Sequence, residues 1–474
     1  MNNNMISEHQ SPKNYPDILI DRTSVIKPCV AQEKASDLFL DKNVSKFNRL
    51  WVYLHLVIEF IKQFYLIIRS YLYPYSSYPL DEVCDIFSRC AHWSSSPVRA
   101  FAWHPNHDRC ALAICNDYIH VYQGPTRIRI LRQVHQYKVV DLAWKPSDAD
   151  ILAVATQKQI IIWSLTSDQS TKFYLIDPKL CPPIVNIQFN DELLYACSPN
   201  SYKIAVIDLK LQEGTALVNH IGTFGHGTTR LLWAPNKKRL ASSTTSPLFH
   251  VFEPFKWTSK SWQLEGHFVQ DMVWSKPSGR MLLLASRNEP CVYALPFLDQ
   301  PEPNDVGGNM SLMKVLNLQP TAGETGTIGG LVQALVWDKN GKRLALAFKD
   351  NPECVLIYKT LERPTVEFQQ LGIIQSATNS SAQIIQFHDN FKNGSLLTIC
   401  WSDGLCQHVS FNYTNHEHSL SEPISGVNLE VTRSPRSMTS FCHVTDTLLS
   451  PVSKFQHHNG LFSTRARKVE QKSE

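Results

Sequence analysis

The chain has 474 residues, of which 43% are hydrophobic and 19% charged, and its net charge is +4. This composition is typical of a globular β-rich protein and excludes a chain that is mainly disordered. It contains no concentrated basic stripe, so nucleic-acid binding is not expected. The 12 cysteines include no Cys-x-x-Cys pair, so we expect buried thiols in a reducing compartment rather than a disulfide framework.

The first segment, residues 1–45, is polar, contains three prolines and shows little periodicity, which predicts a flexible N-terminal arm. Residues 1–5 have neither a basic start nor an apolar core, so no signal peptide is expected. A terminal strand often closes a ring-shaped fold, and this arm is one candidate for that role.

Residues 46–97 are expected to form a helical segment. The part from Phe47 to Tyr73 is rich in apolar residues and free of Gly and Pro, which predicts one helix. Glu59 and Lys62 would lie near the middle of a bilayer, so we do not expect a membrane span. The helix either packs on the rest of the protein or docks a membrane or partner. Its candidate partner-binding residues are Leu50, Trp51, Leu54, Ile58 and Phe64.

A second, shorter helix is predicted between Pro79 and Trp93. Asp81 and Glu82 suit a first helical turn, because carboxylates there interact favourably with the helix dipole. The apolar face of this helix is predicted to consist of Leu80, Val83, Ile86 and Phe87.

Residues 98–411 repeat one pattern of three short strands joined by tight polar turns. In the first copy, Val98–Trp103 alternates along a strand that stops before Pro105, because proline cannot donate a ladder hydrogen bond. Seven copies recur, with the key aromatic roughly forty residues apart in most of them. These aromatics are Trp103, Trp144, Phe189, Trp233, Trp274, Trp337 and Phe387.

This periodicity predicts an all-β fold, a seven-bladed WD40-type β-propeller, with an insertion at residues 299–330. The alternative is a β-sandwich in which the spacing is accidental. The polar side chains that stiffen consensus WD-repeat blades are mostly missing, so we expect the blades to depend on strand burial alone. Residues 412–474 are polar and are expected to form a disordered C-terminal tail.

No catalytic pattern is found, neither a Gly-x-Ser-x-Gly nucleophile elbow, nor a phosphate-binding Gly-rich loop, nor a His-Glu-x-x-His zinc motif. His104 and His107 have metal-ligand spacing, but they are expected to belong to a surface turn because no third ligand is evident. We therefore expect no enzyme activity, no cofactor, no metal and no small-molecule substrate.

The segment from His92 to Pro105 resembles the aladin family of WD-repeat nucleoporins. The resemblance runs from about Pro79 to Phe411. The other segments that carry it are Leu142–Pro146, Ile151–Ala155, Gly372–Gln375 and Ile384–His388.

The resemblance implies a non-catalytic scaffold or adaptor subunit of the nuclear pore complex at the nuclear envelope. It implies partners among nuclear pore proteins, above all a pore-membrane nucleoporin through which any membrane association would be indirect. It also implies a role in nuclear protein import and, in mitosis, at the spindle poles. The competing hypothesis is a WD-repeat substrate receptor for a ubiquitin ligase, or a vesicle-coat adaptor.

Overall fold

The computed structural model describes residues 46–165, 171–210, 215–223, 225–265, 268–297, 306–308, 311–323, 326–362, 366–376, 378–392, 394–413 and 442–443. The predicted arm, residues 1–45, and most of the predicted tail, residues 412–474, lie outside this part of the chain. The chain divides into two compact units, residues 1–69 and residues 70–474, which are treated separately below.

The helices occur where the sequence predicts them. The long helix α2 spans Lys46–Leu72, and it is followed by the short 3-10 helix η1 (Pro74–Ser77). The second helix, α3, spans Leu80–Phe87 and has Pro79 at its N-cap and Asp81 and Glu82 in its first turn. Val83, Cys84 and Phe87 of α3 are buried, whereas Leu80 and Ile86 are only partly buried, so the buried face differs from the predicted one at Cys84.

The second unit is a seven-bladed β-propeller built from four-stranded antiparallel sheets in simple meander order. Blades 1–3 consist of β1 (Val98–Trp103), β2 (Arg109–Ile114), β3 (Ile119–Gln123), β4 (Thr126–Leu131), β5 (Val139–Trp144), β6 (Ile151–Thr156), β7 (Ile160–Ser164), β8 (Lys172–Ile176), β9 (Asn186–Asn190), β10 (Leu193–Cys197), β11 (Lys203–Lys210) and β12 (Thr215–Gly222). Blades 4 and 5 consist of β13 (Thr228–Trp233), β14 (Leu240–Thr244), β15 (Leu248–Glu253), β16 (Thr258–Gln263), β17 (Val269–Trp274), β18 (Met281–Ser286), β19 (Cys291–Pro296) and β20 (Met313–Asn317). Blades 6 and 7 consist of β23 (Val332–Trp337), β24 (Arg343–Phe348), β25 (Cys354–Glu362), β26 (Val366–Gln375), β27 (Ala382–His388), β28 (Gly394–Trp401), β29 (Leu405–Asn412) and β30 (Cys442–His443).

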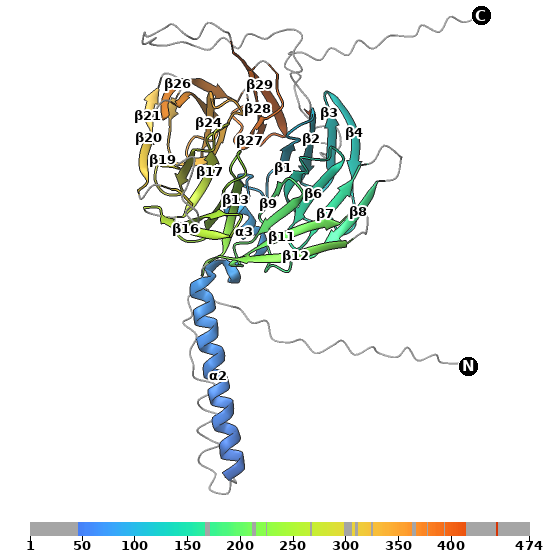
Figure 1. Cartoon of the computed structure of the whole chain (residues 1–474), viewed down its shortest axis with the longest axis vertical. Coiled ribbons are helices and arrows are strands. Elements are labelled where there is room, and N and C mark those ends of the chain that lie inside the picture. Colours follow the sequence, from blue (N-terminus) through green and yellow to red (C-terminus); the bar gives the residue numbers. More distant parts are fainter. Residues whose placement is uncertain are drawn as a thin grey trace, which may run out of the picture. The chain divides into compact units, whose positions relative to one another are not determined.

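The first strand of each blade is innermost, and consecutive inner strands contact one another around the ring. The inner strand of the last blade, β27, contacts β1, so the ring is closed. Figure 1 shows the inner strands β9, β13 and β27 near the middle of the ring and β4, β8 and β20 at its periphery. The predicted seven-bladed fold is confirmed, and the sandwich alternative is wrong.

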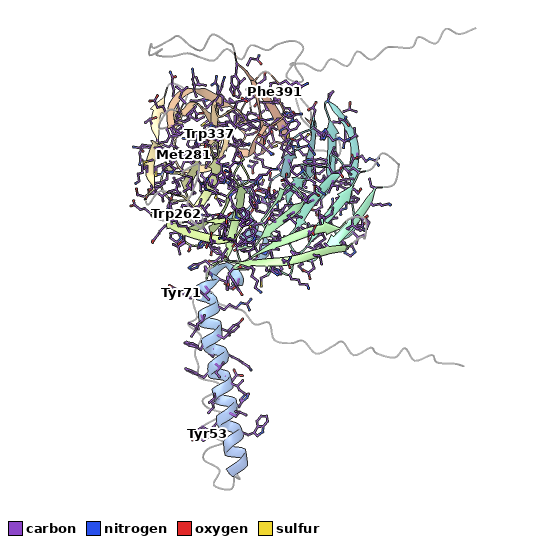
Figure 2. The ribbon with its side chains drawn as sticks, viewed as in Figure 1. Tyr53, Tyr71, Trp262, Met281, Trp337 and Phe391 are labelled. Carbon is purple, nitrogen blue, oxygen red and sulfur yellow. The ribbon has the colours of Figure 1, made fainter. Side chains whose placement is uncertain are left out.

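Burial of apolar side chains between adjacent blades forms the core. Each interface places an aromatic of one inner strand against the preceding sheet. Trp274 belongs to one apolar cluster with Phe249 and Val251 of blade 4, and Trp337 belongs to the next cluster with Leu283 of blade 5. Trp262, Met281 and Trp337 lie among the strands of the ring in Figure 2. Burying a large apolar side chain contributes about 1.5–3 kcal/mol, so these interfaces supply most of the stabilisation.

Polar side chains also link the blades, which corrects the expectation that the blades depend on strand burial alone. The buried carboxylate of Asp141 accepts hydrogen bonds from the Asn186 amide (2.8 Å) and the Ile187 backbone (3.0 Å) in the next blade. Asn186 accepts in turn from the Leu231 backbone (2.9 Å), and Asp271 accepts from the Leu335 backbone (3.0 Å). These inter-blade clamps satisfy inner-strand N–H groups, which would otherwise be buried without an acceptor.

A further polar chain joins the first blade to the last. The indole of Trp103 donates to the Thr398 hydroxyl (2.8 Å), which lies 2.9 Å from Nδ1 of His408. An indole N–H can only donate, so the Thr398 hydroxyl proton is available to a neutral His408. His388 stacks on Trp103 at 4.2 Å between ring centroids, and burial, followed by His388, lowers the pKa of His408 to about 4.

We expect the propeller to lose stability between pH 6.5 and pH 4, because the unfolded chain binds a proton at His408 before the folded chain does. Lowering the pH from 7 to 5 costs about 2 kcal/mol for one such group, and urea unfolding at both values measures this. His408→Gln should lower the number of protons taken up on unfolding in this pH range by about one, so the free energy of unfolding should depend less on pH. This holds whatever the substitution does to the stability at pH 7. An unchanged slope would contradict the assignment.

Two predicted boundaries change in the structure. Residues 299–330 were expected to be an insertion, but Met313–Asn317 form β20, the outer strand of blade 5. Thr321–Gly323 (β21) and Gly326–Ile328 (β22) form a separate two-stranded hairpin. Within the predicted disordered tail, Cys442–His443 form β30, which pairs with Leu405 and Cys406 of β29 as the outer strand of blade 7. Both strands are short, with five residues in β20 and two in β30, and this explains why neither has a clear signal in the sequence.

Candidate interaction surfaces

Helix α2 carries a narrow polar stripe on an otherwise apolar surface. Asn48, His55, Glu59, Lys62 and Arg69 follow one another at intervals of three, four or seven residues, so they lie on one side of the helix. Lys62 forms an ion pair with Glu59 (2.7 Å) within this stripe, and this hydrogen bond holds the pKa of Glu59 below its usual value. The charged side chains of this stripe are therefore suited to contact with water.

Most of the rest of α2 is apolar, and its large apolar side chains are exposed. Four of the predicted partner-binding residues show large exposed fractions: Trp51 (62%), Leu54 (54%), Ile58 (41%) and Phe64 (56%). Leu50 lies one helical turn before Leu54, and the ring of Phe60 stacks on that of Phe64. Figure 2 shows the side chains of Tyr53 and Tyr71 extending from the same helix. Among the described residues, no helix combines the length and the apolar run needed to cross a bilayer.

The segment of residues 80–97, called the strap here, lies across one end of the propeller. Val83 and Phe87 of α3 belong to the same apolar cluster as Val185 of blade 3 and Leu231 of blade 4. The ring of Phe87 lies 5.2 Å from that of Phe268, which directly precedes the inner strand of blade 5. The strap thus packs on several blades at the end of the ring where the inner strands begin, called the strap face below.

Polar contacts hold the strap in register. The Ala91 backbone donates to the carbonyl of Gln383 in blade 7 (3.0 Å), and the Trp93 indole donates to the carbonyl of Val139 in blade 2 (2.9 Å). The carboxylate of Asp81 accepts from Lys138 (2.6 Å) and Gln157 (2.8 Å). Although partial burial raises the pKa of Asp81, the two hydrogen bonds bring it below its usual value.

A cavity of about 570 Å³ follows the axis of the ring. Its lining includes Arg99 near the start of an inner strand and Lys276 beyond the end of another, so it extends along the inner strands. The charged groups that line it mostly hold structural contacts, since Arg230 pairs with Asp271 (3.4 Å) and Lys276 pairs with Asp389 (2.7 Å). The acidic side chains there serve as clamps and ion pairs, and this does not resemble a catalytic constellation.

The residues considered for metal or redox chemistry have structural roles. The pair at His104 and His107 was expected in a surface turn, but His104 is fully buried, and its Nδ1 accepts N–H hydrogen bonds from Asn106 and His107 (3.0 Å each). Across the described residues, no three His, Cys, Asp or Glu side chains gather as a metal site. Burial raises the pKa of the Cys84 and Cys90 thiols to about 12, so they act as small apolar side chains.

The sequence predicted that residues 46–97 either pack on the propeller or dock a partner, and it predicted an apolar face on the second helix that includes Val83 and Phe87. It did not indicate which blades the strap contacts, nor the inter-blade clamps. The strap joins residues far apart in sequence, such as Asp81 with Lys138, and no local pattern encodes such pairs.

A closed ring with one end covered by its own chain, together with an exposed apolar helix, defines the class of β-propeller interaction scaffolds. A model of the Aladin seven-bladed propeller family matches residues 80–412, from the first residue of α3 onward, and the chain belongs to this family. A curated relative, Aladin from Arabidopsis thaliana, is 26% identical over 326 residues, which cover 60% of this chain and 69% of that protein. The resemblance found in the sequence is thereby confirmed.

Among solved structures, the propeller domain of Cps50 (Swd1) from Myceliophteria thermophila is similar with a TM-score of 0.51. The sequence identity is 13%, and the likeness covers 65% of this chain and 94% of that chain. At this identity it concerns the fold alone.

Proposed function

We propose that the protein is a non-catalytic scaffold or adaptor subunit of the nuclear pore complex at the nuclear envelope. The observation that carries this proposal is the family match over the whole propeller together with the strap. The structural role of the charged groups along the axial cavity supports a scaffold, because these groups link blades to one another. The scaffold takes no cofactor and no small-molecule substrate, and it does not bind nucleic acid.

In this proposal, α2 attaches the scaffold to a pore-membrane nucleoporin. Exposed apolar side chains such as Trp51, Leu54 and Ile58 are costly in water and are stabilised when a partner helix or groove covers them. The membrane association of the protein is then indirect, through this partner. Other nuclear pore proteins bind the propeller, and the assembly supports nuclear protein import and contributes at the spindle poles in mitosis.

Replacing Trp51, Leu54 and Ile58 by Ser should abolish the nuclear-rim signal of a tagged chain in living cells. Each lost apolar contact is worth about 1.5–3 kcal/mol, so the triple change weakens attachment by more than about a thousandfold. The matched control replaces His55, Lys62 and Gln63 by Ser. It changes the same number of residues to the same amino acid, on the polar stripe and at Gln63 directly beside it, and should keep the rim signal.

A rim signal that survives the apolar triple change would show that α2 is not the anchor. If the unaltered chain gives no rim signal and copurifies with ligase or coat subunits, the pore proposal itself is wrong. That result would favour the substrate-receptor or coat-adaptor hypothesis.

A further inference from the structure

Six blades each have the same type of backbone hydrogen bond on the strap face. The residue directly after the second strand of the blade donates its backbone N–H to the carbonyl of the residue just before the inner strand. This repeated bond places six side chains at equivalent positions around the strap face. They belong to Cys115, Gln157, Thr245, Arg287, Lys349 and Ser402.

One of these positions already holds a carboxylate. In blade 2, the Gln157 amide donates to Asp81 of the strap (2.8 Å), and the neighbouring Lys138 donates to the same carboxylate (2.6 Å). The strap face can therefore bind an acidic side chain at this position of a blade. In blade 2 the strap itself provides that side chain.

The equivalent positions in blades 5 and 6 are both basic. The guanidinium of Arg287 lies over the ring of Phe268, 4.9 Å from its centroid, and Nζ of Lys349 donates to Oε1 of Gln270 (2.8 Å). Both side chains are half-buried. Within the described residues, neither forms an ion pair with a carboxylate. The neighbours of Arg287 are the Phe268 ring and Tyr75, and the partner of Lys349 is a neutral amide.

The charged groups nearby compensate these two cations only in part. Burial, followed by repulsion from Arg287, lowers the pKa of Lys349 to about 8, and Arg230 adds to the repulsion. Arg230 is itself paired with Asp271, so that carboxylate is already used. Asp350 raises the pKa of Lys349, while one of its carboxylate oxygens, Oδ2, accepts the backbone N–H of Leu331 (2.8 Å).

We infer that Arg287 and Lys349 form an anion-binding site on the strap face that takes the carboxylate side chains of an acidic segment of a partner protein. An incoming carboxylate would offset the repulsion between the two cations, and Asp81 beside Lys138 shows that a carboxylate fits at the equivalent place in blade 2. Both cations are half-buried, so the anion has to reach them on a narrow side chain. This favours a protein segment over a flat membrane surface. The inference does not depend on a location at the nuclear pore.

Fluorescence anisotropy of a labelled hexaglutamate peptide with the purified full chain tests the site. Lys349→Gln should weaken binding about tenfold or more, because a charge-assisted hydrogen bond is lost, while the new amide can still donate to Gln270. Lys237→Gln is the matched control, since it removes one exposed positive charge in a different turn, and it should change binding less than about twofold. Arg287→Lys keeps the charge and should retain part of the affinity.

Peptide binding should also weaken as the pH rises through about 8, because Lys349 then loses its proton, and this dependence should vanish in Lys349→Gln. The charged groups that face Lys349 are Arg287, Arg230 and Asp350. Equal affinities of Lys349→Gln and Lys237→Gln would overturn the site, as would binding without this pH dependence. Tighter Lys349-dependent binding to phosphatidylserine vesicles than to the peptide would overturn the choice of a protein partner.

Discussion

Deleting residues 1–97 should lower the free energy of unfolding of the propeller by more than about 5 kcal/mol, whereas deleting residues 1–72 should change it by less than about 1 kcal/mol. The longer deletion removes the strap, in which Val83, Phe87 and Trp93 are buried against the blades. Losing a buried Phe or Trp side chain costs about 3–5 kcal/mol each. Urea unfolding followed by tryptophan fluorescence measures both differences.

Point variants in the full chain separate this effect from that of a new chain terminus. Phe87→Ala should cost about 3–5 kcal/mol, because it leaves a cavity beside Phe268. Phe255→Ala, at a position that is 87% exposed, should be nearly neutral and serves as the control. Equal stability of the two deleted chains would contradict the role assigned to the strap.

Replacing Asp141 by Ala should cost about 3 kcal/mol, although the change is small in volume. The carboxylate is buried and accepts hydrogen bonds from Asn186 and from the backbone of Ile187, and both donors would be left without a partner. Chemical unfolding of the purified variant measures the loss. Because the clamp joins two blades, the loss should appear as a lower midpoint for the whole ring.

Two comparisons make this prediction specific. Asp141→Asn keeps one acceptor oxygen and should lose less than Asp141→Ala does. Glu192→Ala removes a carboxylate that is itself exposed, and should cost less than Asp141→Ala does, although it takes a partner from the buried Lys145. If the Asp141 and Glu192 variants are equally stable, the clamp does not contribute to the ring.

The first three strands of each blade could be predicted from the sequence because both of their faces are buried. Ile151–Thr156 is buried at every residue, and such a run of apolar residues is easy to recognise. The outer strands could not be predicted in this way. Thr126–Leu131 has one buried residue, and its basic side chains are those of any exposed loop.

The interactions that close and stiffen the ring could not be predicted, because they join residues distant in sequence. Asp141 and Asn186 occupy ordinary strand positions, and only the packed ring brings them within 2.8 Å. The polar side chains of consensus WD-repeat blades are mostly missing from the sequence, and this led to the wrong expectation that the blades depend on burial alone. The structure uses other residues, such as Thr398 and His408, for a related purpose.

Of the two interaction surfaces, one could be predicted from the sequence and the other could not. The apolar character of α2 follows from composition, since nothing in Lys46–Leu72 interrupts the helix and few charges interrupt the apolar surface. The basic pair on the strap face depends on the equivalence of Arg287 and Lys349 in adjacent blades. The two residues follow unrelated strand sequences, and only the backbone hydrogen bonds show that their positions correspond.

The outer strand of blade 7 has a consequence for the order in which the protein assembles. Cys442–His443 pair with β29, so the last sheet reaches its four strands only after residue 443 has been synthesised, later than all the other blades. The strap is translated before any blade, yet its contact with Gln383 has to wait for blade 7. The residues of the strap that are buried in the folded ring therefore stay uncovered on the ribosome until the blades they pack against have been made.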